Sequence, residues 1–273
     1  MTKRYTLPTF FLLTFALTWA MWIPATITKA SGGTSVFSPD NPVGQLGRWA
    51  PGIAAILLTG LVAGKGGIGA LFRPLKIWRV NIGWYAFAML FQPVLFFAAK
   101  LLDSLLGKTY QVTSPLASVS IDAPIIFIVL GVIISAIPGA FMEELGWRGF
   151  ALPRMQHKTT ALTASILLGF VWGVWHIPSM IFFGQTDVLS IALSVINFIP
   201  GTIIFTWLFN NTKGSLLLVT LFHASTQYSN NFLGVIPTQT ANILVWLVAI
   251  TIVVLTDVTN FSKTSKRVQL TDN

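Results

Sequence analysis

The sequence predicts an all-α membrane protein, a polytopic bundle of about eight transmembrane helices with its N- and C-termini in the cytoplasm. Three observations lead to this prediction. Of the 273 residues, 54% are hydrophobic and 9% are charged, against roughly 25% charged residues in soluble domains. The apolar residues form runs of about 20, the length of a helix that crosses a bilayer. The Lys and Arg residues concentrate in the loops that alternate spans place on one side.

The expected spans follow the apolar runs in chain order, with polar loops between them. They lie near Leu7–Ile27, Trp49–Ala63, Ile82–Leu102, Ala123–Leu152, Thr160–Phe183, Val188–Phe209, Ser215–Asn230 and Asn242–Val258. No loop is long enough for a soluble domain, so we expect residues 1–273 to form a single integral membrane domain.

The net charge of +9 is explained by membrane topology rather than by nucleic acid. If the N-terminus lies inside, only four of the 17 basic residues fall on outer segments, namely Lys29, Arg48, Lys100 and Lys108. This bias is the positive-inside pattern. We therefore expect a multi-pass protein of a cell membrane, with the lipid bilayer and no nucleic acid as its partner.

The paired acids Glu143 and Glu144 are the most informative polar residues of the chain. Only 8 residues are acidic, and a carboxylate near hydrocarbon costs several kcal/mol on insertion scales, which marks a candidate functional site. On a helix, Arg148 lies four residues after Glu144 and can pair with it. Glu143 points about 100° away and has no such partner. We expect Glu144 to be neutralised and Glu143 to be available.

Two of the three histidines lie inside expected spans. His176 has Trp172 four residues before it, and His223 has Gln227 four residues after it, so each pair shares a helix face. His157 lies in a basic loop and is expected at the surface.

The depth of these residues decides whether they can meet. If the fourth helix stops at Leu152 before Pro153, Glu144 lies roughly 12 Å and His223 roughly 15 Å from the cytoplasmic side, but His176 lies roughly 25 Å deep. A tilt or a later helix start would be needed to bring His176 to the others.

If they meet, the group suits hydrolysis of a peptide bond. A glutamate in an apolar pocket can deprotonate water, one imidazole can orient that water or share a metal, and a second imidazole with an amide can stabilise an oxyanion. Other interpretations are structural: an ion pair at a helix end, a histidine that bonds two helices, and tryptophans that only pack. The chain contains no His-Glu-x-x-His zinc pattern. It has no Cys, so any metal would need His, Glu, Asp or Asn ligands.

At these residues the chain resembles the CAAX prenyl protease type 2 family, also called the CPBP (CAAX protease and bacteriocin-processing) or Abi family. Glu143-Glu144-x-x-x-Arg148 matches the first family motif in full. The second appears as Trp172-x-x-x-His176, with Trp where Phe is usual. The third appears as His223-x-x-x-Gln227, with Gln in place of Asn. The resemblance covers a catalytic core of about 123–231.

The resemblance implies an intramembrane endopeptidase. Glu143 would act on water with the help of His176, His223 would serve the oxyanion or a metal, and Glu144 with Arg148 would support them. Families of this kind are described both as metalloproteases and as glutamate-dependent enzymes. The resemblance therefore leaves open a divalent metal such as zinc on Glu143, His176 and His223.

Three functions remain open at this point. The first is an endopeptidase of the bacterial cytoplasmic membrane that cleaves a peptide or membrane protein, prenylated or not. In bacterial relatives the family is linked to bacteriocin maturation and immunity. The second is a non-catalytic immunity or scaffold protein of the same fold, which the Gln227 departure favours. The third is a proton-coupled transporter, which would predict internal repeats that the sequence does not display. The sequence leaves the substrate and the oligomeric state open.

Overall fold

The structure, a computed structural model, describes residues 6–108, 137–233 and 239–262, and its regular secondary structure there is entirely helical. The predicted all-α fold is confirmed. The long helices are α1 (Thr6–Ala30), α2 (Ala50–Phe72), α3 (Ile82–Leu105), α6 (Ala161–Trp175), α8 (Val188–Asn211), α9 (Leu216–Leu233) and α10 (Gln239–Leu255). Shorter segments are η2 (Gly44–Trp49), η3 (Arg73–Lys76), η5 (Leu145–Ala151), α5 (Leu152–Gln156) and α7 (Ile177–Phe182).

Four segments of the described chain are long and apolar enough to cross a membrane: α1, the run Gly44–Lys76, α3 and α8. α6, α10 and residues Leu216–Gln227 of α9 are apolar but shorter. Large apolar side chains such as Leu61 and Val188 point outward, 77% and 82% exposed, which suits contact with lipid rather than water. The chain is an integral membrane protein.

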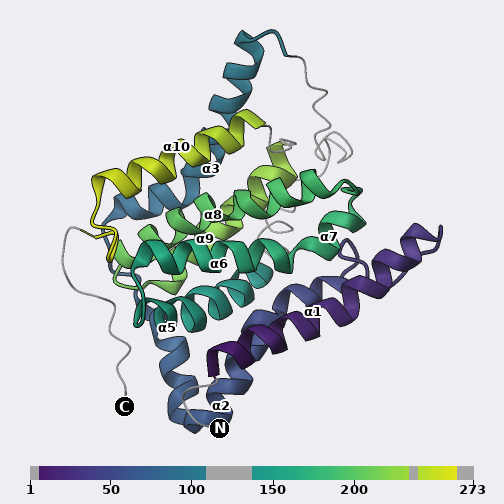
Figure 1. The fold of residues 1–273 in the computed structure, drawn as a ribbon. Helices are drawn as coiled ribbons and strands as arrows, with labels where there is room; N and C mark the ends of the chain where they lie inside the picture. The colour runs from purple at the N-terminus through teal and green to yellow at the C-terminus, as the bar shows by residue number, and fades with distance from the viewer. Residues whose placement is uncertain (1–5, 109–136, 234–238, 263–273) are drawn as a thin grey trace, which may run out of the picture.

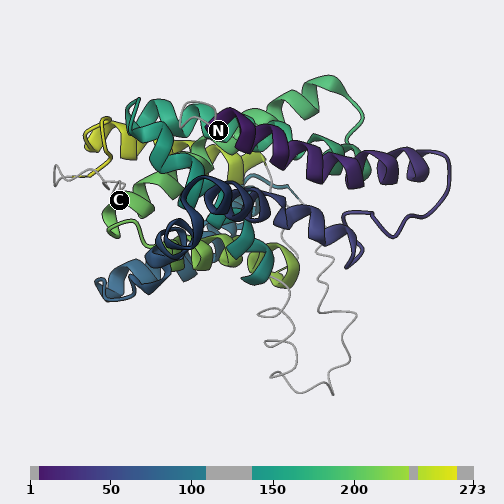
Figure 2. The same ribbon diagram turned by 90° about the horizontal axis from the view of Figure 1, so that it is seen from below.

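The helices pack in three groups, one in the middle and one on each side of it (Figure 1). α6 lies against α8 in the middle, α3 packs on α9 and α10 on one side, and α1 packs on α2 and α7 on the other. The view from below shows α1 running along the edge of the molecule (Figure 2). The segment of residues 137–156, which carries the paired glutamates, contacts α2 and α9 through η5.

Two glycines allow α6 and α8 to approach closely. A Cβ added to Gly173 would lie 2.6 Å from the carbonyl oxygen of Val195, and one added to Gly169 would lie 2.8 Å from the Cα of Ile199. The α8 backbone therefore occupies the space that a side chain would need at either glycine. Spacing of small residues by four is a common way for membrane helices to pack, and here it brings the Trp172 face of α6 into the core.

Two expected spans differ from the structure. The span Thr160–Phe183 is broken at His176, which ends α6 and precedes α7. The fourth span, whose residues 123–136 lie outside the described part, does not stop at Leu152. It continues as the π-helix η5 and then as α5, through Pro153 to Gln156. Pro153 is tolerated because it stands in the first turn of α5, where a missing N–H costs least.

Candidate active site

Glu144 and Arg148 form the ion pair that the sequence predicts. Nη1 of Arg148 donates to Oε1 of Glu144 at 2.8 Å, and both side chains are fully buried. The guanidinium of Arg148 also lies over the rings of Trp172 and Phe205, 4.5 and 4.0 Å from their centroids. Arg148 is therefore enclosed by a carboxylate and two aromatic faces, a favourable setting for a desolvated cation.

Arg148 belongs to η5, a π-helix that begins directly after Glu144. A π-helix has a wider turn than an α-helix and occurs often at functional sites. Gly146 lets this segment press against the start of α2, because a Cβ there would lie 2.4 Å from Cβ of Pro51. The paired glutamates are thus held next to η2 and α2.

His223 of α9 lies between the two glutamates. Its Nδ1 is 2.7 Å from Oε1 of Glu144, and its Nε2 is 3.9 Å from Oε1 of Glu143. Because a carboxylate only accepts, Nδ1 carries the hydrogen of the shorter contact. This bond fixes the ring and directs Nε2 toward Glu143.

Glu143 is not free, and this part of the sequence prediction is wrong. Its Oε1 accepts a hydrogen bond from Nε of Arg48 at 2.9 Å, and Nη2 of Arg48 lies 2.8 Å from the same oxygen as an ion pair. Glu143 is fully buried, whereas the Arg48 side chain is 20% exposed. A buried carboxylate requires a compensating charge. No basic residue lies three or four positions from Glu143 on its own helix. The compensating cation, Arg48, instead comes from η2, 95 residues earlier in the chain.

Trp172 joins Glu143 to His176. Its indole Nε1 donates to Oε2 of Glu143 at 3.1 Å, and its backbone carbonyl oxygen lies 2.8 Å from Nδ1 of His176. A carbonyl accepts, so Nδ1 of His176 holds the hydrogen. Among the described residues, no hydrogen-bond partner of Nε2 of His176 is found, which leaves that nitrogen as an acceptor. The His176 ring packs against Trp175 and Phe198, with centroids 4.6 Å apart in each case.

Gln227 lies beside His223, as the four-residue spacing predicts. With its amide oxygen turned toward Arg48, Gln227 accepts from Nη1 and Nη2 of that residue, at 3.3 Å for Nη1. The same oxygen lies 3.3 Å from Nε2 of His223. The amide therefore connects the Arg48 guanidinium with the second imidazole.

His176 reaches the cluster although helix counting placed it deeper than the glutamates. The fourth helix ends at Gln156 rather than Leu152 and includes the π-helix η5, so a straight count at about 1.5 Å per residue does not apply to it. Trp172 contacts Glu143 through its indole and His176 through its carbonyl oxygen, and these contacts bring the two residues together.

A metal site on Glu143, His176 and His223 does not fit this arrangement. Within the described residues, no group of three or more His, Asp or Glu side chains is placed to hold a metal ion. The guanidinium of Arg48 also lies 2.8 Å from the Glu143 oxygen that faces His223, so a cation already occupies that side of the carboxylate.

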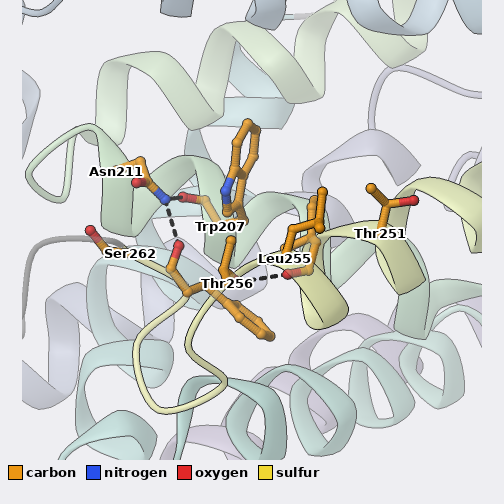
Figure 3. A pocket seen from close by; sticks show the side chains of 8 residues that line it. Trp207, Asn211, Thr251, Leu255, Thr256 and Ser262 are labelled. Atoms are coloured by element: carbon orange, nitrogen blue, oxygen red, sulfur yellow. Dashed lines mark hydrogen bonds between the residues drawn. The ribbon is translucent and has the colours of Figure 1, made fainter.

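A separate pocket of about 510 Å³ lies between the C-terminal ends of α8 and α10 (Figure 3). Its lining contains no acid, base or histidine. Asn211 already donates to the carbonyl oxygens of Trp207 and Phe261 at 2.8 Å, and Thr256 donates to Ile252 at 2.6 Å. This pocket lacks the groups that hydrolysis needs.

The structure thus gathers every residue that the sequence singled out and adds one that it missed. Glu143, Glu144, Arg148, Trp172, His176, His223 and Gln227 form one connected cluster. Arg48 is the addition. The signal that could have found it is charge balance: two buried glutamates need two cations, and Arg148 satisfies only one.

Two comparisons with known proteins agree with the motifs. Residues 123–229 match the family model described as type II CAAX prenyl endopeptidase Rce1-like. The chain is also 27% identical over 242 residues to CAAX prenyl protease 2 of Methanococcus maripaludis, an alignment that covers 81% of this chain and 82% of the relative. The resemblance to this protease family is confirmed.

Proposed function

We propose that this chain, a relative of the type II CAAX prenyl endopeptidases, is an intramembrane endopeptidase that hydrolyses a peptide bond with a water activated by Glu143 and His176. The single observation that carries the proposal is the buried cluster itself. The chain has 8 acidic residues and 3 histidines, and two of each meet in it. Burial of so many polar groups is costly in a membrane protein and marks a functional site.

The proposed reaction begins with a water held between Glu143 and the unprotonated Nε2 of His176. Glu143 takes a proton while the water oxygen bonds to the scissile carbonyl carbon. The tetrahedral intermediate then collapses, the C–N bond breaks, and the proton passes from Glu143 to the leaving amine nitrogen. The products are a carboxylic acid and an amine, so atoms and charge balance.

His223 and Gln227 would act on the oxygen of the scissile carbonyl. In this role His223 would act as an imidazolium, in which both ring nitrogens donate, and Glu144 accepts from its Nδ1. A protonated Nε2 can donate to the developing oxyanion, with the Gln227 amide beside it. Glu144 and Arg148 would then orient His223 rather than touch the substrate.

The test is cleavage of reporter peptides by the purified protein in lipid vesicles. We expect Glu143→Gln, His176→Ala and His223→Ala to lower kcat/KM by at least about 100-fold, since general acid–base groups contribute 10²–10⁴-fold. His157→Ala is the matched control, because this histidine is exposed, and it should keep wild-type activity. Wild-type cleavage by Glu143→Gln would disprove the mechanism.

A non-catalytic membrane protein is the second candidate. The Arg48–Glu143 ion pair favours it, because a carboxylate whose charge is already balanced can have a purely structural role. An immunity or scaffold role would require the fold but not the chemistry. In that case Glu143→Gln would retain the biological phenotype, and no peptide, prenylated or not, would be cleaved by the wild type.

A further inference from the structure

Arg48 makes a two-donor contact with the proposed base. Its Nε and Nη2 both reach Oε1 of Glu143, at 2.9 and 2.8 Å, while Trp172 holds Oε2 at 3.1 Å. A planar guanidinium imposes a direction on the carboxylate that a lysine ammonium cannot. Both oxygens of Glu143 are therefore fixed by donors from outside its own helix.

The segment that carries Arg48 is itself anchored on both sides. Nε1 of Trp22 donates to the carbonyl oxygen of Gly44 at 2.9 Å, and Oγ1 of Thr18 donates to that of Gly47 at 2.7 Å. A Cβ on Gly47 would lie 2.6 Å from Nε1 of Trp22, so α1 packs directly on this turn. These contacts fix the backbone from which Arg48 extends.

The residue one turn before Glu143 also leaves room for the guanidinium. The Cβ position of Gly139 lies 3.5 Å from Cζ and Nη1 of Arg48, so a longer side chain there would compete with Arg48 for space. On its far side, Arg48 contacts Gln45 through Nη1 at 3.4 Å and the amide of Gln227. Gln227 is one methylene longer than the Asn of the family motif.

We propose that Arg48 is a positioning residue for this site, a role that rests on the proposed function. Arg48 orients the carboxylate of Glu143 toward the attacking water. Through Gln227 it couples that carboxylate to His223, the group on the oxyanion side. Arg48 acts through its neighbours and does not touch the reacting atoms.

The test compares Arg48→Met and Arg48→Lys with wild type in the vesicle assay, with kcat and KM measured from pH 5 to 9. Arg48→Met should lower kcat about 100-fold, the scale of a small misplacement of a reacting group, and change KM less than about threefold. Without the cation the ionised carboxylate is harder to maintain, so the acid limb of the kcat/KM profile should move to higher pH. Arg73→Met, at an exposed arginine, is the control.

Arg48→Lys keeps the buried charge of Glu143 balanced. It therefore tests the role of Arg48 even when Arg48→Met fails to fold. It should keep the acid limb near its wild-type pH but recover only part of kcat, about a tenth of the wild-type value, because one ammonium cannot reproduce the two-donor contact. In a Glu143→Gln background, Arg48→Lys should cause no further loss, since residues that act as a unit are not additive.

The outcomes separate this inference from the proposed function. A wild type that cleaves no reporter overturns both. A wild type that cleaves, with Arg48→Lys at wild-type kcat, overturns only the role of Arg48. A loss of kcat in Arg48→Lys that persists in full in the Glu143→Gln background would show that Arg48 acts on the fold rather than through Glu143.

Discussion

Trp172 donates its indole N–H to Oε2 of Glu143 across 3.1 Å in a fully buried site. The family motif usually has Phe at this position, and Phe has no hydrogen to donate. The same tryptophan packs edge to face on Phe198 and Phe205, with centroids 5.1 and 5.7 Å away. Trp172 therefore combines a packing role with a direct bond to the proposed base.

Trp172→Phe isolates that bond. The smaller ring keeps an aromatic face toward Phe198 and Phe205 but removes the donor. A hydrogen bond to a charged group contributes about 1.5–3 kcal/mol, so we expect kcat to fall about tenfold or more with little change in KM. Steady-state kinetics on a reporter peptide measure it. Unchanged kcat would mean that Arg48 alone holds the carboxylate.

The Glu144–Arg148 pair should be a strong determinant of stability. Arg148→Met leaves the buried Glu144 without its cation, and removal of one partner of a buried pair costs about 3–5 kcal/mol. Thermal unfolding in detergent measures the loss. The matched variant is Glu144→Gln with Arg148→Met, which removes both charges and should recover part of the stability. A double variant less stable than Arg148→Met would contradict this account.

Local spacing predicted the Glu144–Arg148 pair because both residues lie on one helix, four positions apart. The same reasoning failed for Glu143. Its partner Arg48 is 95 positions away, and only the packing of η2 against residues 137–144 brings the two together. The sequence placed Arg48 in an outer segment among topology charges. A contact between distant spans depends on tertiary packing. The spacing of residues along one helix carries no information about such packing.

The helices themselves were largely predictable from apolar runs, and their interruptions were not. Pro153 suggested a helix end, yet the helix continues through η5 and α5 to Gln156. His176 looked like part of a continuous span, yet it stands at a helix break followed by Pro178. The expected depths assumed straight α-helices, so the early stop at Leu152 misplaced the glutamates relative to His176.

Close packing between α6 and α8 should make Gly173→Ala destabilising. The added Cβ would lie 2.6 Å from the Val195 carbonyl oxygen and 2.9 Å from its Cα, and overpacking of this kind costs about 1–3 kcal/mol. Gly201→Ala on α8 is the control, because nothing lies within 4 Å of its Cβ position. Thermal unfolding should show a lower Tm for the first variant only. Equal Tm values would mean that α6 and α8 can shift to accept the added methyl group with no loss of stability.

Metal chelation should leave cleavage unchanged. Both carboxylates of the cluster already have a guanidinium at 2.8 Å, Arg48 for Glu143 and Arg148 for Glu144. A divalent ion on Glu143 would have to displace or repel Arg48, at a Coulombic cost that grows in a site of low dielectric. We therefore expect kcat/KM to stay within about twofold after dialysis against a strong zinc chelator, since a twofold change is below 1 kcal/mol. Metal content measured on the same sample provides the control. Loss of activity that zinc restores, with one ion bound per chain, would show that Arg48 leaves Glu143 in the working enzyme.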